Sequence, residues 1–286
     1  MNLPNNLPKI SVVTPSFDQV RFLEDTIRSV LDQGYENLEY IIIDGGSTDG
    51  SIEVIRKYSD RLAYWTSEKD FGQSNAINKG LARSTGDILC WLNSDDKLLP
   101  GTLTFVAELF SNNSYLECFY GDTVCIDQAN RILLKRHEIS FDFNTLLHAM
   151  NYVPQSSTFW RRSVYEKIGG LDESLHYTMD HEYWLRMARN RVTIEYVPRF
   201  LSQYRWHESS KGNINSSKIN EERAIIRRKY SRMPRVYLLE RLLHYPLKTY
   251  FRIRRQCIKI IKYKKVELVP AHFIRWYLKV VKKHFA

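Results

Sequence analysis

Short apolar runs alternate with segments of helical periodicity along the first hundred residues. Four runs rich in Ile, Val, Leu and Trp predict buried strands at residues 10–14, 38–43, 62–66 and 88–92. Apolar side chains that recur every three or four residues predict helices at residues 21–32, in a segment ending near residue 58, and at residues 73–82. Strands that alternate with helices favour right-handed crossovers, so we expect an α/β fold with a mostly parallel sheet and helices on both faces.

Polar residues stand close to the end of each predicted strand. Ser16 follows the first strand, Asp44 ends the second, Asp70 comes shortly after the third, and Asp95 and Asp96 follow the fourth. Because the carboxyl ends of parallel strands meet at one edge of a sheet, these side chains are expected to converge on a nucleotide site. Taken singly, each Asp is more typical of a turn or a helix N-cap than of a ligand site.

Two neighbouring carboxylates also predict a cation. Like charges a few ångströms apart resist ionising together, so Asp95 and Asp96 favour a positive group beside them. Hard divalent ions such as Mg²⁺ or Mn²⁺ take carboxylate oxygens and keep positions open for substrate phosphates. The alternative for this stretch alone is a solvated turn before Pro100 and Gly101.

Several classes of protein are disfavoured by the sequence. No G-x-G-x-x-G follows the first strand and no G-x-x-x-x-G-K-[ST] occurs, which argues against a dinucleotide oxidoreductase and a P-loop enzyme. A content of 43% hydrophobic and 26% charged residues is ordinary for a folded globular protein. The four cysteines have no C-x-x-C spacing, so we expect reduced core residues and a cytosolic protein.

Four motifs carry a specific resemblance. They are Val13-Thr-Pro-Ser-Phe17, Ile43-Asp-Gly-Gly-Ser-Thr-Asp-Gly-Ser51, Asp70-Phe-Gly-Gln-Ser-Asn-Ala-Ile-Asn-Lys-Gly80 and Leu92-Asn-Ser-Asp-Asp-Lys-Leu-Leu-Pro-Gly101. In this order and spacing they resemble the N-terminal half of the family 2 glycosyltransferases. The resemblance implies an inverting enzyme of the GT-A fold, with a mixed, mainly parallel sheet flanked by helices, that uses a nucleotide-diphospho-sugar and Mn²⁺ or Mg²⁺.

The resemblance also implies roles for individual residues. Asp44 would contact the base, Asp95 the ribose, and Asp96 the metal that bridges the diphosphate. The remaining residues expected near the nucleotide are Pro15, Ser16, Asp70 and Asn75. A carboxylate accepts a hydrogen bond from N3–H of uracil or thymine, so Asp44 slightly favours UDP, although guanine also offers donors.

The catalytic base is expected in the second half of the chain. Asp180 begins a predicted helix, at a point where family members usually carry Glu-Asp and this chain has Met179 and Asp180. Inversion by direct displacement needs a base to take the proton of the acceptor hydroxyl, and we assign that role to Asp180. N-capping of the helix is the alternative role, and Glu182 is a weaker candidate for the base.

Three further features lie in the second half of the chain. His207 follows a predicted strand, where similar enzymes often have a third metal ligand or a diphosphate contact, although an isolated His is more often structural. Arg205 and Lys211 are expected to offset diphosphate charge. Residues 124–134 predict a β-hairpin, and Asp122 resembles another strand end.

The C-terminal part of the chain is strongly basic. Residues 223–286 carry 19 Lys and Arg against two acids, whereas residues 1–222 have a net charge of −7. Helical segments are expected here at residues 223–230, 237–244, 250–263 and 273–285, separated by prolines. Basic helices with interfacial aromatics favour binding to an anionic bilayer, with packing of a solvated basic face on the body as the alternative. RNA binding is disfavoured because no RNA-binding motif is present.

These features together predict two parts and one activity. Residues 1–220 are expected to form the glycosyltransferase domain, with a nucleotide-sugar half at about 9–122 and an acceptor half at about 123–220, and residues 221–286 a basic helical extension. No apolar run reaches the roughly 20 residues that span a bilayer, so we expect a cytoplasmic enzyme held peripherally at the inner face of the membrane. The acceptor would be a polysaccharide or a lipid-linked saccharide. The alternatives are a sugar-nucleotide-forming nucleotidyltransferase and a non-catalytic nucleotide-sugar binding protein.

Overall fold

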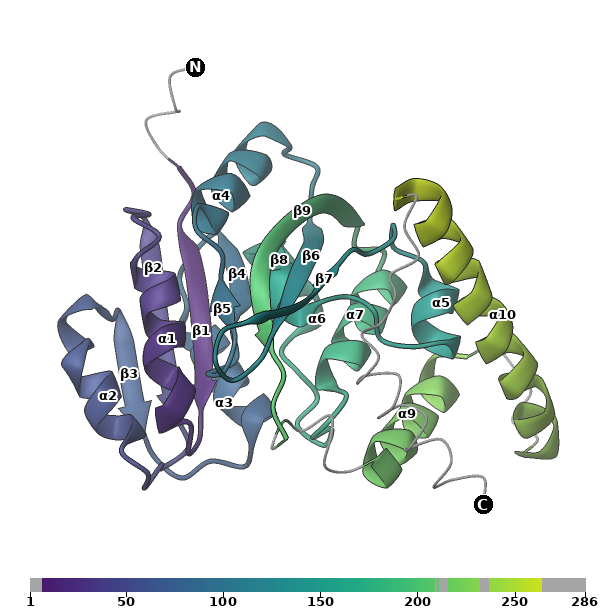
Figure 1. The fold of residues 1–286 in the computed structure, drawn as a ribbon, viewed down its shortest axis with the longest axis horizontal. Coiled ribbons are helices and arrows are strands. Elements are labelled where there is room, and N and C mark those ends of the chain that lie inside the picture. The colour runs from purple at the N-terminus through teal and green to yellow at the C-terminus, as the bar shows by residue number, and fades with distance from the viewer. Residues whose placement is uncertain (1–6, 209, 211–215, 232–236, 264–286) are drawn as a thin grey trace.

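The computed structural model describes residues 7–208, 210, 216–231 and 237–263, and Figure 1 shows their arrangement. The described residues form one nine-stranded sheet. Its strands are β1 (Ile10–Ser16), β2 (Leu38–Asp44), β3 (Tyr64–Ser67), β4 (Ile88–Trp91), β5 (Lys97–Leu98), β6 (Cys118–Ile126), β7 (Ile132–Arg136), β8 (Thr158–Arg161) and β9 (Ile194–Arg205).

Helices flank the sheet, and the last two lie at one end of the molecule beside α5 and α7 (Figure 1). The helices are α1 (Val20–Leu31), α2 (Ser51–Lys57), α3 (Gln73–Arg83), α4 (Thr102–Asn112), α5 (Phe143–His148), α6 (Arg162–Ile168), α7 (Met179–Arg189), α9 (Ser216–Tyr230) and α10 (Tyr237–Tyr263), with 3-10 turns η1 (Ser59–Arg61) and η2 (Gln155–Ser157).

The strand order is β3-β2-β1-β4-β8-β6-β9-β5, and β7 pairs with β6 outside this order. The strands β1 to β4 pair in parallel, whereas β8 runs antiparallel to both β4 and β6. The α/β prediction with a mixed sheet is therefore confirmed. The four strands that the apolar runs predict, β1 to β4, form one parallel unit of this sheet, and β6 and β9 also pair in parallel.

An aromatic cluster joins the two halves of the molecule. Trp91 at the end of β4 stacks on Trp184 of α7, with ring centroids 5.5 Å apart and planes inclined by 11°. Trp160 of β8 packs edge-on against Trp91 at 5.4 Å. All three side chains are buried, so the tryptophans fill the core and hold α7 against the end of β4.

Two expectations about secondary structure are wrong. Asp122 lies in the middle of β6 and does not end a strand. A Cβ atom at Gly121 would lie 2.5 Å from the carbonyl oxygen of Arg199, so the glycine in the middle of β6 allows β9 to approach closely. Helix α10 also continues through Pro246, where a break was expected. The predicted hairpin is confirmed as β6 and β7.

The cysteine prediction is confirmed only in part. All four cysteines are free thiols, and Cys90 and Cys118 are buried in the core. Cys125 is half-buried, and Cys257 is exposed on α10 and is therefore not a core residue.

The described part of the C-terminal extension packs on the rest of the protein. The Glu222 carboxylate of α9 accepts hydrogen bonds from the backbone N–H groups of residues 176–178, at 2.8–3.0 Å. Arg255 of α10 is buried and donates to the buried Glu138 carboxylate. The division at residue 220 stays a prediction, as does the helix at 273–285, which lies outside the described residues. No helix in the described ranges is long and apolar enough to cross a bilayer.

Candidate active site

The structure brings Asp95 together with His207, which lies 112 residues further along the chain. Asp95 follows β4 and His207 follows β9, and the Asp95 Oδ2 and His207 Nε2 atoms are 2.9 Å apart. The His207 ring also lies against Phe22 of α1, with ring centroids 5.0 Å apart. His207 is therefore held at the edge of the sheet where the parallel strands end.

Asp96, the residue after Asp95, is almost completely buried. Its Oδ1 accepts a hydrogen bond from the backbone N–H of Arg205 at 3.0 Å, and its Oδ2 accepts one from the Asn93 side chain at 3.3 Å. Burial, together with the neighbouring Asp95 charge, raises the pKa of Asp96 well above its usual value. A cation beside this group would favour the ionised form.

Asp95 and His207 are joined by a hydrogen bond of 2.9 Å. Their carboxylate oxygen and imidazole nitrogen are both groups that can bind a divalent transition-metal ion such as Mn²⁺. Among the residues that the structure describes, no group of three or more His, Cys, Asp and Glu side chains is arranged to hold a metal. Such an ion would thus take its remaining ligands from substrate phosphates and water, as Mg²⁺ commonly does.

Arg205 does not face this site as expected. Its side chain is fully buried, donates to the carbonyl oxygen of Asp95 at 2.9 Å, and reaches the Asp25 carboxylate at 3.2 Å. The expectation that Arg205 offsets diphosphate charge is therefore wrong, because its guanidinium is committed to internal contacts. Lys211 lies outside the described residues.

Asp44 orders the loop that follows β2. The carboxylate is fully buried, and it accepts hydrogen bonds from the backbone N–H of Gly46 and Ser47 and from the hydroxyls of Ser47 and Ser67, at 2.6–3.1 Å. These bonds occupy most of its acceptor capacity. The contact between Asp44 and a base stays a prediction.

Ser16 and Asp70 flank the same loop. Ser16 pairs in register with Asp44, and Pro15 with Ile43, as neighbours in β1 and β2. Ser16 Oγ is buried and has no hydrogen-bond partner within the described part of the chain, so it is available to a ligand. A Cβ atom at Gly45 would lie 2.9 Å from Asp70 Oδ2, which places the Asp70 carboxylate directly against this loop.

Asn75 of α3 connects the nucleotide half to the segment before α7. Its Nδ2 donates to Glu173 Oε2 at 2.9 Å, and Asn78, one turn later, donates to Glu173 Oε1 at 2.8 Å. The backbone N–H of Phe71 lies 3.4 Å from Asn75 Oδ1. Asn75 thus positions the loop that leads into α7, and its contact with a nucleotide stays a prediction.

Asp180 lies in the first turn of α7. Thr178 is the residue at the N-cap position, and its side chain makes no capping bond. Asp180 Oδ2 accepts a hydrogen bond from Asn151 Nδ2 at 2.7 Å, and its Oδ1 faces the backbone N–H of His181 at 2.7 Å. Burial raises the pKa of Asp180 to about 6, although these hydrogen bonds and the charge of Arg223 oppose the rise. A carboxyl group with this pKa is suited to take a proton near neutral pH.

Glu182 is occupied by other side chains. Its carboxylate is fully buried and binds Arg186 at 3.0 Å and Lys229 at 2.9 Å, and it also accepts a hydrogen bond from Tyr230. Despite its burial, these partners lower the pKa of Glu182. Glu182 therefore ties α7 to α9, which weakens the case for it as the base.

No role was expected for Asn151, or for Gln73 within the motif at residues 70–80. Asn151 holds the Asp180 carboxylate, and Gln73 Nε2 donates to Asn93 Oδ1 at 2.8 Å, which joins α3 to the residues before Asp96. Neither residue stands in a charged or periodic pattern that would have singled it out.

Comparison with known proteins identifies related sequences. The family model described as Glycosyl transferase family 2 matches residues 11–169. An uncharacterized glycosyltransferase of Mycobacterium tuberculosis is 33% identical over 183 residues, which cover 63% of this chain and 69% of that protein. An uncharacterized glycosyltransferase of Rickettsia typhi is 24% identical over 230 residues, which cover 76% of this chain and 70% of that protein.

Solved structures resemble the fold at low sequence identity. A structure of S. aureus TarS in complex with UDP-GlcNAc aligns with a TM-score of 0.62 and 14% identity, over 91% of this chain and 76% of that one. A mannosyltransferase from Pyrobaculum calidifontis in complex with GDP-Man and Mn²⁺ aligns with a TM-score of 0.60 and 14% identity, over 96% of this chain and 81% of that one. This likeness confirms the predicted GT-A type of fold.

Proposed function

Because this chain belongs to glycosyl transferase family 2, we propose that it transfers a sugar from a nucleotide-diphospho-sugar, with UDP favoured, to an acceptor hydroxyl of a cell-envelope polysaccharide or glycolipid. The observation that carries the proposal is the 2.9 Å pairing of Asp95 with His207 at the edge where the parallel strands end. Ligands of open α/β sheets bind at this edge. Structurally similar proteins bind UDP-GlcNAc, or GDP-Man with Mn²⁺, which supports a nucleotide-sugar donor.

The cation is proposed to lie at the group formed by Asp95, Asp96 and His207. The contact between Asp95 and His207 makes Asp95 a candidate direct ligand beside His207, whereas the resemblance implied Asp96 and His207. When bound, Mn²⁺ or Mg²⁺ neutralises the charge that develops on the leaving diphosphate. Comparing the Mn²⁺ affinity of the Asp95→Asn and Asp96→Asn variants distinguishes the two assignments.

Asp180 is proposed to act as the general base. It would take the proton of the acceptor hydroxyl as that oxygen attacks the anomeric carbon, from the face opposite the leaving diphosphate, so that the configuration inverts. Stacking of Trp184 on Trp91 supports this role, because it fixes α7 against the strand that ends next to Asp95. Asn151 would hold the Asp180 carboxylate in place.

Thermal shift measurements with UDP-, dTDP- and GDP-sugars in the presence of Mn²⁺ test the donor. A ligand at 100 times its Kd stabilises a protein by about 2.7 kcal/mol, which corresponds to a rise in Tm of roughly 5–10 °C. We expect this rise with a UDP-sugar and its loss in EDTA. A chain that no nucleotide-sugar stabilises would contradict the proposal, and donor binding without even slow donor hydrolysis would indicate a non-catalytic binding protein.

The outward face of α10 is proposed to rest on an anionic membrane. Large apolar side chains are exposed along one face of this helix at Tyr250, Ile253, Ile260 and Ile261. This pattern is typical of helices that lie in the membrane interface. Co-sedimentation with phosphatidylglycerol vesicles should fall when Ile253 and Ile261 are both changed to Ser, and unchanged sedimentation would exclude this role.

A further inference from the structure

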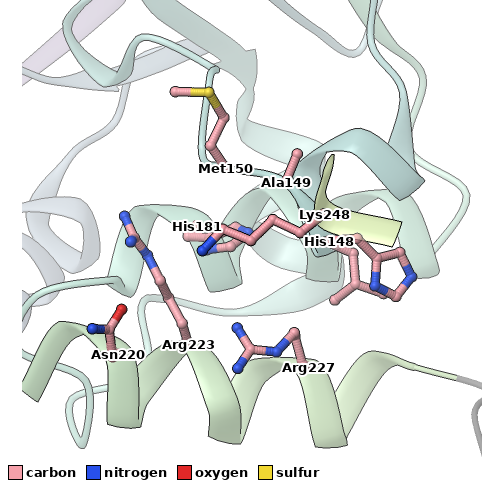
Figure 2. A pocket seen from close by; sticks show the side chains of 9 residues that line it. His148, Ala149, Met150, His181, Asn220, Arg223, Arg227 and Lys248 are labelled. Carbon is pink, nitrogen blue, oxygen red and sulfur yellow. The ribbon is translucent and has the colours of Figure 1, made fainter. Parts of the chain in front are cut away.

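A cavity of about 270 Å³ lies among α5, α7, α9 and α10 (Figure 2). Its walls combine residues from these four helices with the segment after α5, namely Leu147, His148, Ala149, Met150, His181, Asn220, Arg223, Arg227 and Lys248. In Figure 2 the Arg223 and Arg227 side chains rise from α9, and Lys248 extends toward His181. None of the roles assigned above uses this cavity.

The cavity is strongly basic, and its charge is poorly balanced. Three of its lining side chains are basic, namely Arg223, Arg227 and Lys248, and the described residues that line it include no acid. Within the described part of the chain, Arg223 and Lys248 form no hydrogen bond or ion pair, and Arg223 Nε is a buried donor without a partner. Unpaired charges that are withdrawn from water are costly, so such a cluster is typical of a site for an anion.

The pKa values of the basic groups reflect the cost of burying unpaired charge. Burial lowers the pKa of Lys248, and the charges of Arg252, Arg223 and Arg227 lower it further. Burial and Arg252 also lower the pKa of Arg223, whereas Asp180 opposes that change. His181 is neutral at pH 7, because burial lowers its pKa to about 4. The positive charge of the cavity therefore comes from the arginines and the lysine.

Asp180 connects this cavity to the proposed chemistry. His181, which follows Asp180 in α7, lines the cavity, and so does Met150, which precedes the Asn151 that binds Asp180. Arg223 also lies close enough to Asp180 for their charges to interact. A ligand held by Arg223 would thus lie within electrostatic reach of the Asp180 carboxylate, which is proposed to take the acceptor proton.

We propose that this cavity binds a phosphate group of the acceptor, held by Arg223 and Lys248, so that the acceptor is a phosphorylated saccharide. Guanidinium and ammonium groups form short, charge-assisted hydrogen bonds with phosphate oxygens. The cavity has room for a phosphate and part of the attached sugar, whose hydroxyl would then face Asp180. This inference rests on the proposed function, since it names the substrate class of the acceptor side.

Calorimetric titration with α-D-glucose 1-phosphate tests the proposal independently of catalysis. We expect the wild-type protein to bind it at least tenfold more tightly than glucose and more tightly than inorganic phosphate. The Arg223→Gln and Lys248→Gln variants should each bind it at least tenfold more weakly. Lys218→Gln is the matched control, because Lys218 is exposed on the same helix as Arg223, and it should bind normally.

Thermal unfolding separates a ligand site from a structural role. Only like charges and burial act on Lys248, so the Lys248→Gln variant is expected to have a Tm that is equal to or above that of the wild type. A clear fall in Tm would show that the fold needs this charge, and would overturn the proposal.

Three titration outcomes would also overturn the proposal. The first is equal binding of glucose 1-phosphate by the cavity variants and the wild type. The second is equal affinity of the wild type for inorganic phosphate and for glucose 1-phosphate. The third is that the variants lose only the binding to phosphatidylglycerol vesicles, which would assign the cavity to lipid headgroups. UDP titration of the Arg223→Gln variant keeps the two hypotheses apart. Normal UDP binding beside lost sugar-phosphate binding supports both, whereas absent UDP binding in the wild type contradicts only the proposed donor.

Discussion

Replacing Asp180 with Asn removes the carboxylate that we assign to proton transfer while it preserves the size of the side chain. An amide cannot accept the proton of the acceptor hydroxyl, and general-base catalysis contributes about 10²–10⁴ in rate. We therefore expect kcat/KM for transfer to fall by about 10²–10⁴. UDP binding should be nearly unchanged, because none of the described contacts of Asp180 involves the residues after β1, β2 or β4.

The pKa of Asp180 sets the pH dependence of the wild-type enzyme. Burial raises that pKa to about 6, and only the ionised carboxylate acts as a base. Roughly nine-tenths of the molecules are ionised at pH 7 and roughly one-tenth at pH 5, so kcat/KM should fall about tenfold between these values. The Asp180→Asn variant should lose this acid limb.

Thermal unfolding provides the control for the Asp180→Asn variant. We expect the Tm of the variant to be unchanged or higher, whereas misfolding would lower it. A carboxyl group whose pKa is higher in the folded protein contributes stability below its unfolded pKa, and this stability is lost as the pH rises through about 6. At pH 7 the amide avoids that loss, so the variant should melt at or above the wild-type Tm. Retention of more than a tenth of the activity, or an unchanged acid limb, would refute Asp180 as the base.

Two further substitutions test the contacts around the site. Asn151→Ala removes a hydrogen bond to the ionised form of Asp180, so the acid limb of kcat/KM should move up by about one pH unit; an unmoved limb would contradict this contact. Arg255→Met leaves the buried Glu138 with fewer partners and should cost about 3 kcal/mol, seen as a fall in Tm of roughly 6 °C or more, whereas Lys218→Met on the exposed face of α9 should change Tm little.

The sequence was sufficient to predict the parallel strands β1, β2 and β4, because strands that are buried on both faces have continuous apolar sequences. Continuous apolar runs mark β1, β2 and β4, and each run ends at the sheet edge where a ligand would lie. The rest of the sheet, in which β6 pairs in parallel with β9 and antiparallel with β7 and β8, has no such continuous runs. Asp122 was expected at a strand end, yet β6 continues through it, and the preceding Gly121 lacks the side chain that would clash with Arg199, on a strand about eighty residues away.

The same reason limits what the sequence reveals about the site. Asp95 and Asp96 were predictable because they follow one strand, but the pairing of Asp95 with His207 depends on the place of β9 in the sheet. The cavity could not be predicted from the sequence, since the packing of four helices brings its cations together. The charge count identified a basic C-terminal part and associated it with a membrane, whereas Arg223 and Lys248 face the interior beside α7.

The opposite charges of the two proposed substrate sites have a consequence for the base. In the free enzyme, the charge of Arg223 holds the pKa of Asp180 below the value that burial alone would give. A phosphate bound to Arg223 would offset that charge, so the acceptor itself would raise the pKa of Asp180 and make the carboxylate a stronger base. Because kcat/KM reports the free enzyme and kcat the substrate complex, the acid limb of kcat should lie at higher pH than that of kcat/KM. The difference should disappear in Arg223→Gln, and a difference that persists there would show that the acceptor does not act through this arginine.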